Sequence, residues 1–209
     1  MPAPAETPQQ VLDFWYGLER PSRKDDGAVR AVLGDAYERA ARHQLDGWAE
    51  APRERLALIL LLDQVPRHLY REDARAFATD FKAQDQTRRF FERQDWMDFH
   101  SIERLSAAMP YLHAEHVAQQ QQVNPVVHAC AGSIAHLHFM GRIADLYLET
   151  IRRFGRFPHR NAMRGIATTA EERRFLDEEW MPRRRRIVPE GMPSWDPALA
   201  EPENPTKRN

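Results

Sequence analysis

The sequence has few cysteines, few glycines and no long apolar run. Its single cysteine, Cys130, excludes a disulfide within the chain, and a lone thiol suits a reducing compartment. The longest apolar run, residues 56–62 (LALILLL), is far shorter than the roughly 20 residues that a membrane helix needs. A secretory signal begins with a basic cluster followed by an apolar stretch. The first ten residues, MPAPAETPQQ, contain neither. We therefore expect a cytoplasmic protein without a membrane-spanning segment.

The chain also lacks an excess of either charge. Its 30 Lys and Arg residues face 31 Asp and Glu residues, which gives a formal net charge of −1. This balance argues against bulk electrostatic binding to nucleic acid or acidic membranes, although it is compatible with a local basic patch. A length of 209 residues with 42% hydrophobic residues suits one domain with a substantial core.

Apolar residues recur at helical spacing, and runs of β-branched residues are almost absent, so the sequence predicts an all-α fold. Short turns between the helices favour antiparallel helical hairpins that stack side by side. Residues 1–180 are expected to form a single helical domain, and the Pro- and Arg-rich residues 181–209 an extended tail. The expected helices cover residues 7–17, 25–45, 52–70, 73–94, 101–122, 125–154 and 168–180.

The segment LLLDQVPRHLYR places polar residues beside a buried apolar run. Asp63 and Arg67 are four residues apart, so they share one helix face, and Pro66 between them cannot donate to the carbonyl of Leu62. One interpretation is that Asp63, Gln64 and Arg67 point into a binding pocket. The other is an internal ion pair, with Asp63 or Gln64 satisfying the backbone group that the proline leaves free.

The segment MPYLHAEH brings His113, Glu115 and His116 close together in sequence. Their spacing is not that of a zinc protease, and the histidines downstream do not complete a set of three or four converging ligands. We therefore expect no metal and no cofactor. If the protein is an enzyme, His113 or His159 is the candidate general acid or base, oriented by Glu115 or Asp63.

The segment RFGRFPHRNAMRG, residues 153–165, carries four arginines and a histidine, and no acidic residue lies between residues 150 and 170. Gly155 should end a helix and Pro158 should stiffen the turn that follows. A rigid turn of this composition suits a planar anion such as a carboxylate or phosphate. The alternative is neutralisation by the protein's own Asp63, Glu115 and Glu149.

Several of these blocks together resemble one bacterial family. VLDFWYG, LALILLLDQVPRHLYR with ARAFATD, PYLHAEH and RFGRFPHRNAM occur in an order and at a spacing similar to those of the family called domain of unknown function 924. The resemblance spans roughly residues 11–180 and implies a tetratricopeptide-like helical fold, but it implies no reaction. The polar positions that it implies are Asp63, Gln64, Arg67, Arg71, Asp80, His113, Glu115, Arg156, His159, Arg160 and Asn161.

The chain departs from the family pattern at Tyr147, where a histidine is expected, and at Arg164–Gly165, where the order is usually Gly-Arg. We hold two hypotheses for function. The first is a binding module that holds a small anion or an acidic peptide; its expected lining is Asp63, Gln64, Arg67, Arg71, Arg156, His159, Arg160 and Asn161. The second is an enzyme acting on a small anionic substrate through His113, Glu115 or His159.

Overall fold

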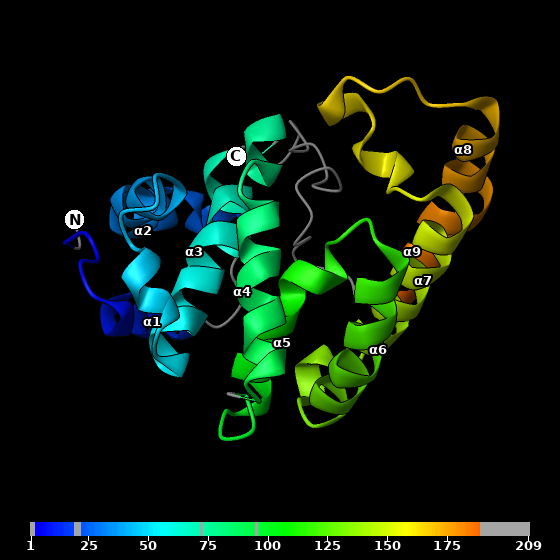
Figure 1. Cartoon of the computed structure of the whole chain (residues 1–209). Helices are drawn as coiled ribbons and strands as arrows, with labels where there is room; N and C mark the ends of the chain where they lie inside the picture. Colours follow the sequence, from blue (N-terminus) through cyan, green and yellow to red (C-terminus); the bar gives the residue numbers. More distant parts are fainter. Residues whose placement is uncertain (1–2, 19–21, 72, 95, 189–209) are drawn as a thin grey trace, which may run out of the picture.

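The computed structural model describes residues 3–18, 22–71, 73–94 and 96–188, and every structural statement below refers to these. They form an all-α fold, as predicted, and contain no β-strand. The helices run side by side and fall into two groups, α1 to α5 and α6 to α9 (Figure 1). Their bounds are α1 Pro8–Gly17, α2 Asp26–Ala41, α3 Pro52–Leu69, α4 Asp80–Glu92, α5 Ser101–Leu112, α6 Val117–Gly132, α7 Met140–Phe154, α8 Ala170–Arg174 and α9 Met181–Ile187.

Two helix starts follow directly from local sequence chemistry. The Thr7 hydroxyl caps α1 by accepting a hydrogen bond from the backbone amide of Gln10. The Gln10 side-chain oxygen in turn accepts a hydrogen bond from the backbone amide of Thr7. Pro8 occupies the first helical position. Thr169 and Glu172 form the same reciprocal box at the start of α8. These caps satisfy amide groups that have no partner inside their helices.

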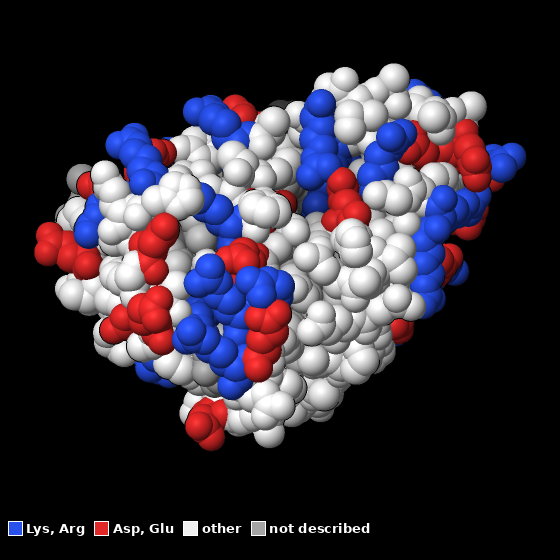
Figure 2. All heavy atoms as spheres, viewed as in Figure 1, with Lys and Arg blue, Asp and Glu red and all other residues white. Residues whose placement is uncertain are grey.

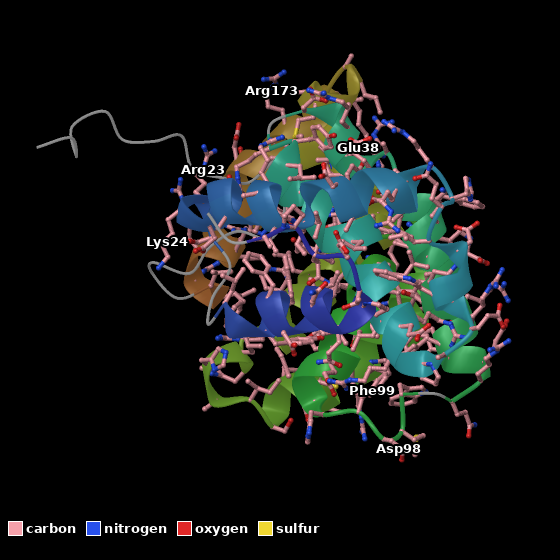
Figure 3. All side chains as sticks on the ribbon, turned by 90° about the vertical axis from the view of Figure 1, so that its left-hand side faces the viewer. Arg23, Lys24, Glu38, Asp98, Phe99 and Arg173 are labelled. Atoms are coloured by element: carbon pink, nitrogen blue, oxygen red, sulfur yellow. The ribbon has the colours of Figure 1, made fainter. Side chains whose placement is uncertain are left out.

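Helix α3 is the central helix of the first group. Every residue from Arg55 to Leu69 is buried, as the apolar run of residues 56–62, which covers every face of the helix, predicts. It contacts α1, α2, α4 and α5. Side chains fill the space between these helices, as the turned view shows for α1 and α2 (Figure 3). The polar residues Asp63 and Arg67 thus lie on the most deeply buried helix of the molecule.

Prolines inside α3 and α5 each leave one backbone carbonyl without its helical donor, and a side chain supplies the missing donor in both cases. The Thr79 hydroxyl donates to the carbonyl of Leu62, four residues before Pro66, at 2.6 Å. The Gln64 amide donates to the carbonyl of Ser106, four residues before Pro110, at 3.3 Å. A buried carbonyl without a partner costs free energy, so these bonds tie α3 to its neighbours.

The helix boundaries between residues 101 and 154 differ from the expected ones. Two helices were expected there, residues 101–122 and 125–154, with the second beginning at Pro125. The structure has three, α5, α6 and α7, separated by residues 113–116 and 133–139. Pro125 lies inside α6. The proline leaves the carbonyl of Gln121 without its helical donor, and because Gln121 is an exposed residue the lost bond should cost little.

The first residues of the expected extended tail are helical. Met181–Ile187 form α9, which packs against α7, and Pro182 lies at the start of that helix, where a proline is tolerated. Residues 189–209, the rest of the predicted tail, lie outside the described residues. The division into a domain of residues 1–180 and a tail of residues 181–209 stays a prediction.

Two apolar clusters form the core. One is built mainly from α1 to α4 and the other mainly from α5 to α9. Helix α5 belongs to both, because Ala107 packs into the first cluster while Leu105, Ala108 and Leu112 pack into the second. The buried charges described below therefore lie where two apolar regions meet.

Replacing Thr79 with valine should destabilise the fold by about 1–3 kcal/mol, because the Leu62 carbonyl then stays buried without a donor. In a Pro66→Ala background the amide of residue 66 can donate to that carbonyl, so Thr79→Val should cost much less there. Urea unfolding of the four proteins in this double-mutant cycle measures the coupling. An equal cost in both backgrounds would show that the hydroxyl does not replace the donor lost at the proline.

Candidate functional site

Four charged or polar side chains meet at the centre of the molecule. The guanidinium of Arg67 lies 3.2 Å from Asp63 Oδ1 and 2.9 Å from Asp80 Oδ1, and its side chain is only 3% exposed. Both carboxylate oxygens of Asp63 lie 3.0 Å from Nδ1 of His113. Helices α3 and α4 and the end of α5 thus each contribute to one network, which we call the Asp–Arg–His cluster.

The two aspartates of this cluster have opposite pKa shifts. Burial raises the pKa of Asp63, but the charges of Arg67, His113 and Arg160 and the hydrogen bond to His113 outweigh it, so the net pKa is lowered. Burial also raises the pKa of Asp80, and the neighbouring charge of Asp63 adds to this, so that Arg67 and Arg160 do not restore the usual value. Asp63 is therefore the firmly ionised partner, and Asp80 is the one that takes up a proton more readily.

Arg160 links the basic turn to the cluster. Its side chain is fully buried and donates to the carbonyl of His113 at 2.9 Å. Its guanidinium lies over two aromatic rings, 4.4 Å from the centre of Phe157 and 5.1 Å from that of Phe77. The turn reaches inward because Gly155 ends α7 with φ of +68°, a conformation that favours glycine, and Phe157 then packs into the core.

Three guanidinium groups converge on the ring of Phe77. Those of Arg67, Arg160 and Arg164 lie 5.7, 5.1 and 5.3 Å from its centre. Arg164 is the outermost, with 31% of its side chain exposed, and it pairs with Glu115. Glu115 also accepts a hydrogen bond from the amide of Phe157 at 3.0 Å. We call these three arginines and Phe77 the guanidinium cluster.

The outer part of the basic turn is neutralised by carboxylates of the same chain. Arg156 pairs with Glu172 at 2.7 Å. Glu172, the capping residue of α8, also accepts a hydrogen bond from the side chain of Asn161. Arg153 pairs with Glu171 at 3.2 Å and with Glu179 at 3.1 Å. The segment that follows the turn in sequence thus supplies most of the compensating charge.

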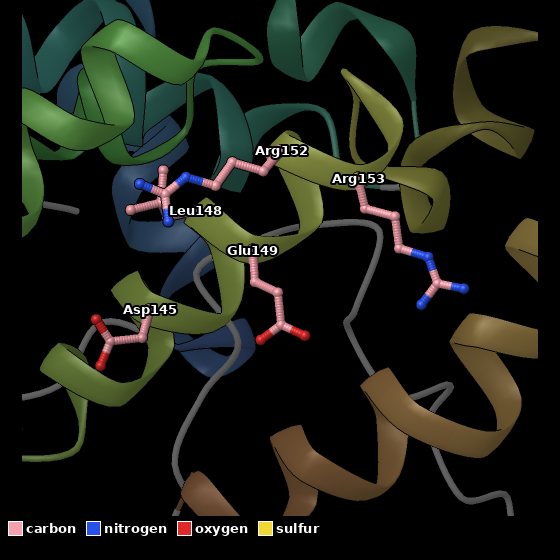
Figure 4. A pocket seen from close by; sticks show the side chains of 5 residues that line it. All are labelled: Asp145, Leu148, Glu149, Arg152 and Arg153. Carbon is pink, nitrogen blue, oxygen red and sulfur yellow. The ribbon is translucent and has the colours of Figure 1, made fainter.

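Glu149, expected as a partner of the turn, pairs elsewhere. It points from α7 toward α9 (Figure 4), where both of its oxygens accept hydrogen bonds from Arg183 at 2.7 Å. It lines a shallow pocket of about 480 Å³ along one face of α7, together with Asp145, Leu148, Arg152 and Arg153. Nε2 of His128 lies 3.0 Å from Oδ1 of Asp145, so most charged side chains of this pocket already have a partner.

His159 lies among aromatic rings. It stacks on Trp180 with 4.6 Å between ring centres, and Phe157 lies 5.4 Å away. Tyr147, where the family resemblance implied a histidine, is buried and packs against Phe157 at 4.9 Å. Of the two candidate histidines, His113 lies beside the carboxylate of Asp63, and the ring of His159 lies among the rings of Phe157 and Trp180.

The remaining candidates have structural partners. The Gln64 amide donates to the carbonyl of Ser106, as described above. Arg71 pairs with Asp26 of α2 at 2.6 Å, beside His68. Sequence reasoning assigned no role to Phe77 beyond apolar packing and none to Thr79. The block ARAFATD contains both, and the carbonyl freed by Pro66 was the signal that a nearby hydroxyl donor should be sought.

The surface shows no large area of one charge on the face that Figure 2 presents, where acidic and basic side chains alternate. Within residues 3–18, 22–71, 73–94 and 96–188, no three His, Cys, Asp or Glu side chains lie close enough together to hold a metal ion. No helix in that part of the chain has the length and apolar character needed to cross a membrane.

Fold and site together define an all-helical protein with a buried cluster of arginine, aspartate and histidine. The sequence pattern of the "Bacterial protein of unknown function (DUF924)" family matches residues 6–179, and the chain belongs to this family. The solved structure of a protein of unknown function from Agrobacterium tumefaciens is similar, with 33% identity and a TM-score of 0.73, over 82% of this chain and 97% of that one. No curated protein matches the sequence.

Replacing Asp80 with asparagine should change how stability depends on pH. Because the pKa of Asp80 is raised on folding, the native state binds its proton more tightly than the unfolded state does. The contribution of the protonated Asp80 to stability is fully present below the ordinary aspartate pKa of 3.8, and it is lost as pH rises through the folded-state pKa. The stability of the unmodified protein relative to Asp80→Asn should therefore fall as pH rises from about 4.

Urea unfolding across this pH range measures the effect. Asp85→Asn, an aspartate of the same helix that pairs with Arg88, is the matched control and should run parallel to the unmodified protein. A difference between the unmodified protein and Asp80→Asn that stays constant or grows with pH would contradict the assignment.

Proposed function

We propose that this protein is a binding module for a small anion, such as a carboxylate or phosphate, or for the carboxylate end of an acidic peptide. The observation that carries the proposal is the convergence of Arg67, Arg160 and Arg164 on the ring of Phe77, at 5.1 to 5.7 Å. The three groups concentrate guanidinium hydrogen-bond donors around one ring. Planar guanidinium groups match the oxygens of carboxylate and phosphate in bidentate geometry.

The charge balance of the cluster supports this proposal. Asp63, Asp80 and Glu115 offset the three arginines one for one when all are ionised. Because the pKa of Asp80 is raised and that of Asp63 is lowered, the charge of Asp80 is the easier of the two to remove, and its protonation leaves the cluster with one net positive charge. An incoming anion supplies the same compensation.

Arg164 gives the anion its route of approach. It is partly exposed, whereas Arg67 and Arg160 are buried behind it. Its pair with Glu115 is partly exposed as well, and ion pairs near the surface are individually weak. Exchange of Glu115 for an external anion at Arg164 therefore costs little, and we assign the first contact of the ligand to this residue.

Replacing Arg164 with glutamine should weaken anion binding at least about tenfold, because a hydrogen bond to a charged group contributes roughly 1.5–3 kcal/mol. Isothermal titration with phosphate, succinate and a short acidic peptide, with and without C-terminal amidation, measures the affinity. The amidated peptide separates recognition of the chain end from recognition of the side chains.

Arg183→Gln is the matched control, since Arg183 is similarly exposed and also pairs with one glutamate. It should leave the affinity unchanged. If neither variant alters the binding of any of the three probes, or both alter it equally, the binding site is not at the guanidinium cluster.

The Asp63–His113 pair favours a second candidate, an enzyme that acts on a small anionic substrate. Asp63 accepts the hydrogen bond from Nδ1, which leaves the lone pair of the imidazole on Nε2. Within the described chain, no residue hydrogen-bonds Nε2. A histidine held in this tautomer by a buried carboxylate has the arrangement of a general base.

On this second hypothesis, His113→Asn should reduce turnover of an anionic chromogenic substrate about a hundredfold or more, the typical contribution of a general base. Release of 4-nitrophenol from 4-nitrophenyl phosphate and 4-nitrophenyl hemisuccinate measures it, with circular dichroism to establish that the variant is folded. Turnover that does not exceed that of buffer, or that is equal in the variant, rules out this activity on these substrate classes.

A further inference from the structure

A second pocket lies between α5 and α6, at the opposite end of α5 from His113. Its volume is about 350 Å³, within the range of pockets that hold small organic molecules. The turn that precedes α5 closes one side of it, and Figure 3 shows part of this turn, Asp98 and Phe99, at the edge of the molecule. The lining residues are Trp96, Ser101, Arg104, Pro125, Val126, Ala129, Cys130 and Ser133.

Arg104 is the single charged side chain among these lining residues, and it is fixed in place. Its Nε donates to the carbonyl of Phe99 at 2.7 Å, and its Nη2 donates to the carbonyl of Met97. These carbonyls orient the guanidinium without cancelling its charge, and no carboxylate of the described chain lies within ion-pair distance of it. The ring of Trp96 lies 5.7 Å from the guanidinium and forms an aromatic wall beside it.

The opposite wall is apolar. Pro125, Val126 and Ala129 come from one face of α6, and the buried thiol of Cys130 lies beside them. Burial raises the pKa of this thiol, and the charge of Arg104 only partly opposes the shift, so the thiol stays neutral. The pocket thus combines one uncompensated positive charge with walls that favour an apolar or aromatic body.

We propose that this pocket binds a small monocarboxylate with an apolar or aromatic body. The carboxylate would pair with Arg104, and the body would lie between Trp96 and the apolar face of α6. The charge specifies one anionic group, and the volume of about 350 Å³ limits the rest to a few ring or chain carbons. This site is separate from the guanidinium cluster and uses none of its residues.

Cys130 is the only cysteine of the chain, so alkylation of its thiol by N-ethylmaleimide reports on this pocket alone. Because the thiol is buried and its pKa is raised, the reaction is slow and is followed over a long time course with excess reagent. Intact-mass spectrometry measures the alkylation rate in the presence of 3-phenylpropionate or of its neutral analogue 3-phenylpropan-1-ol. The acid should slow alkylation saturably. The alcohol should need at least about tenfold higher concentration for the same effect, because it lacks the charge-assisted hydrogen bond.

Arg104→Gln should abolish the preference for the acid, whereas Arg88→Gln, a change at an exposed arginine of α4, should retain it. Because Arg104 also holds the turn before α5, a second variant guards against misfolding. Ala129→Phe, at an exposed position of α6, should narrow the pocket and remove the effect of the acid without lowering the melting temperature. Equal protection by the alcohol, no protection by the acid, or an unchanged preference in folded Arg104→Gln would each overturn the proposal.

Discussion

The pairing of one buried arginine with two aspartates constrains the whole fold. Arg67 lies between Asp63 and Asp80 with almost no exposure to solvent. Charges removed from water lose several kcal/mol of hydration each, and only close, well-oriented partners offset that loss. Such a group adds little net stability, but an arrangement that separates its members costs about 3–5 kcal/mol. Helices α3 and α4 and the end of α5 must therefore meet at one point.

The prolines of α3 and α5 act on the same point. Each frees a carbonyl, and the donors come from across the helix interface, Thr79 for Leu62 and Gln64 for Ser106. Gln64 and Thr79 each adjoin a cluster residue in sequence, Asp63 and Asp80. The contacts of Gln64 and Thr79 are thus explained by the need to give each freed carbonyl a donor. The gathering of three arginines around one ring is not explained by the prolines. This distinction separates the residues that stabilise the fold from those that we assign to the proposed site.

Local sequence chemistry predicted the all-α fold, the buried apolar run of α3 and the end of a helix at Gly155, because each depends on residues close together in the chain. Prediction from local sequence failed where tertiary contacts or solvent determine the structure. Pro125 was expected to begin a helix, yet it is accommodated inside α6. For the site, the spacing of Asp63 and Arg67 predicted a shared helix face, and of the two interpretations left open the structure shows the internal ion pair. The convergence on Phe77 joins residues nearly ninety positions apart, and no periodicity encodes such a contact.

The basic turn shows why charge alone did not locate the site. Its outer arginines, Arg153 and Arg156, pair with glutamates of the segment that follows, and such partly exposed pairs contribute little energy each. What they do is hold the turn against that segment, so that Phe157 and Arg160 point inward. Arg160 is buried, and its charge adds to that of Arg67 in lowering the pKa values of Asp63 and Asp80. The outer ion pairs thus position the turn, and the inner guanidinium groups are the ones to which we assign the proposed anion site.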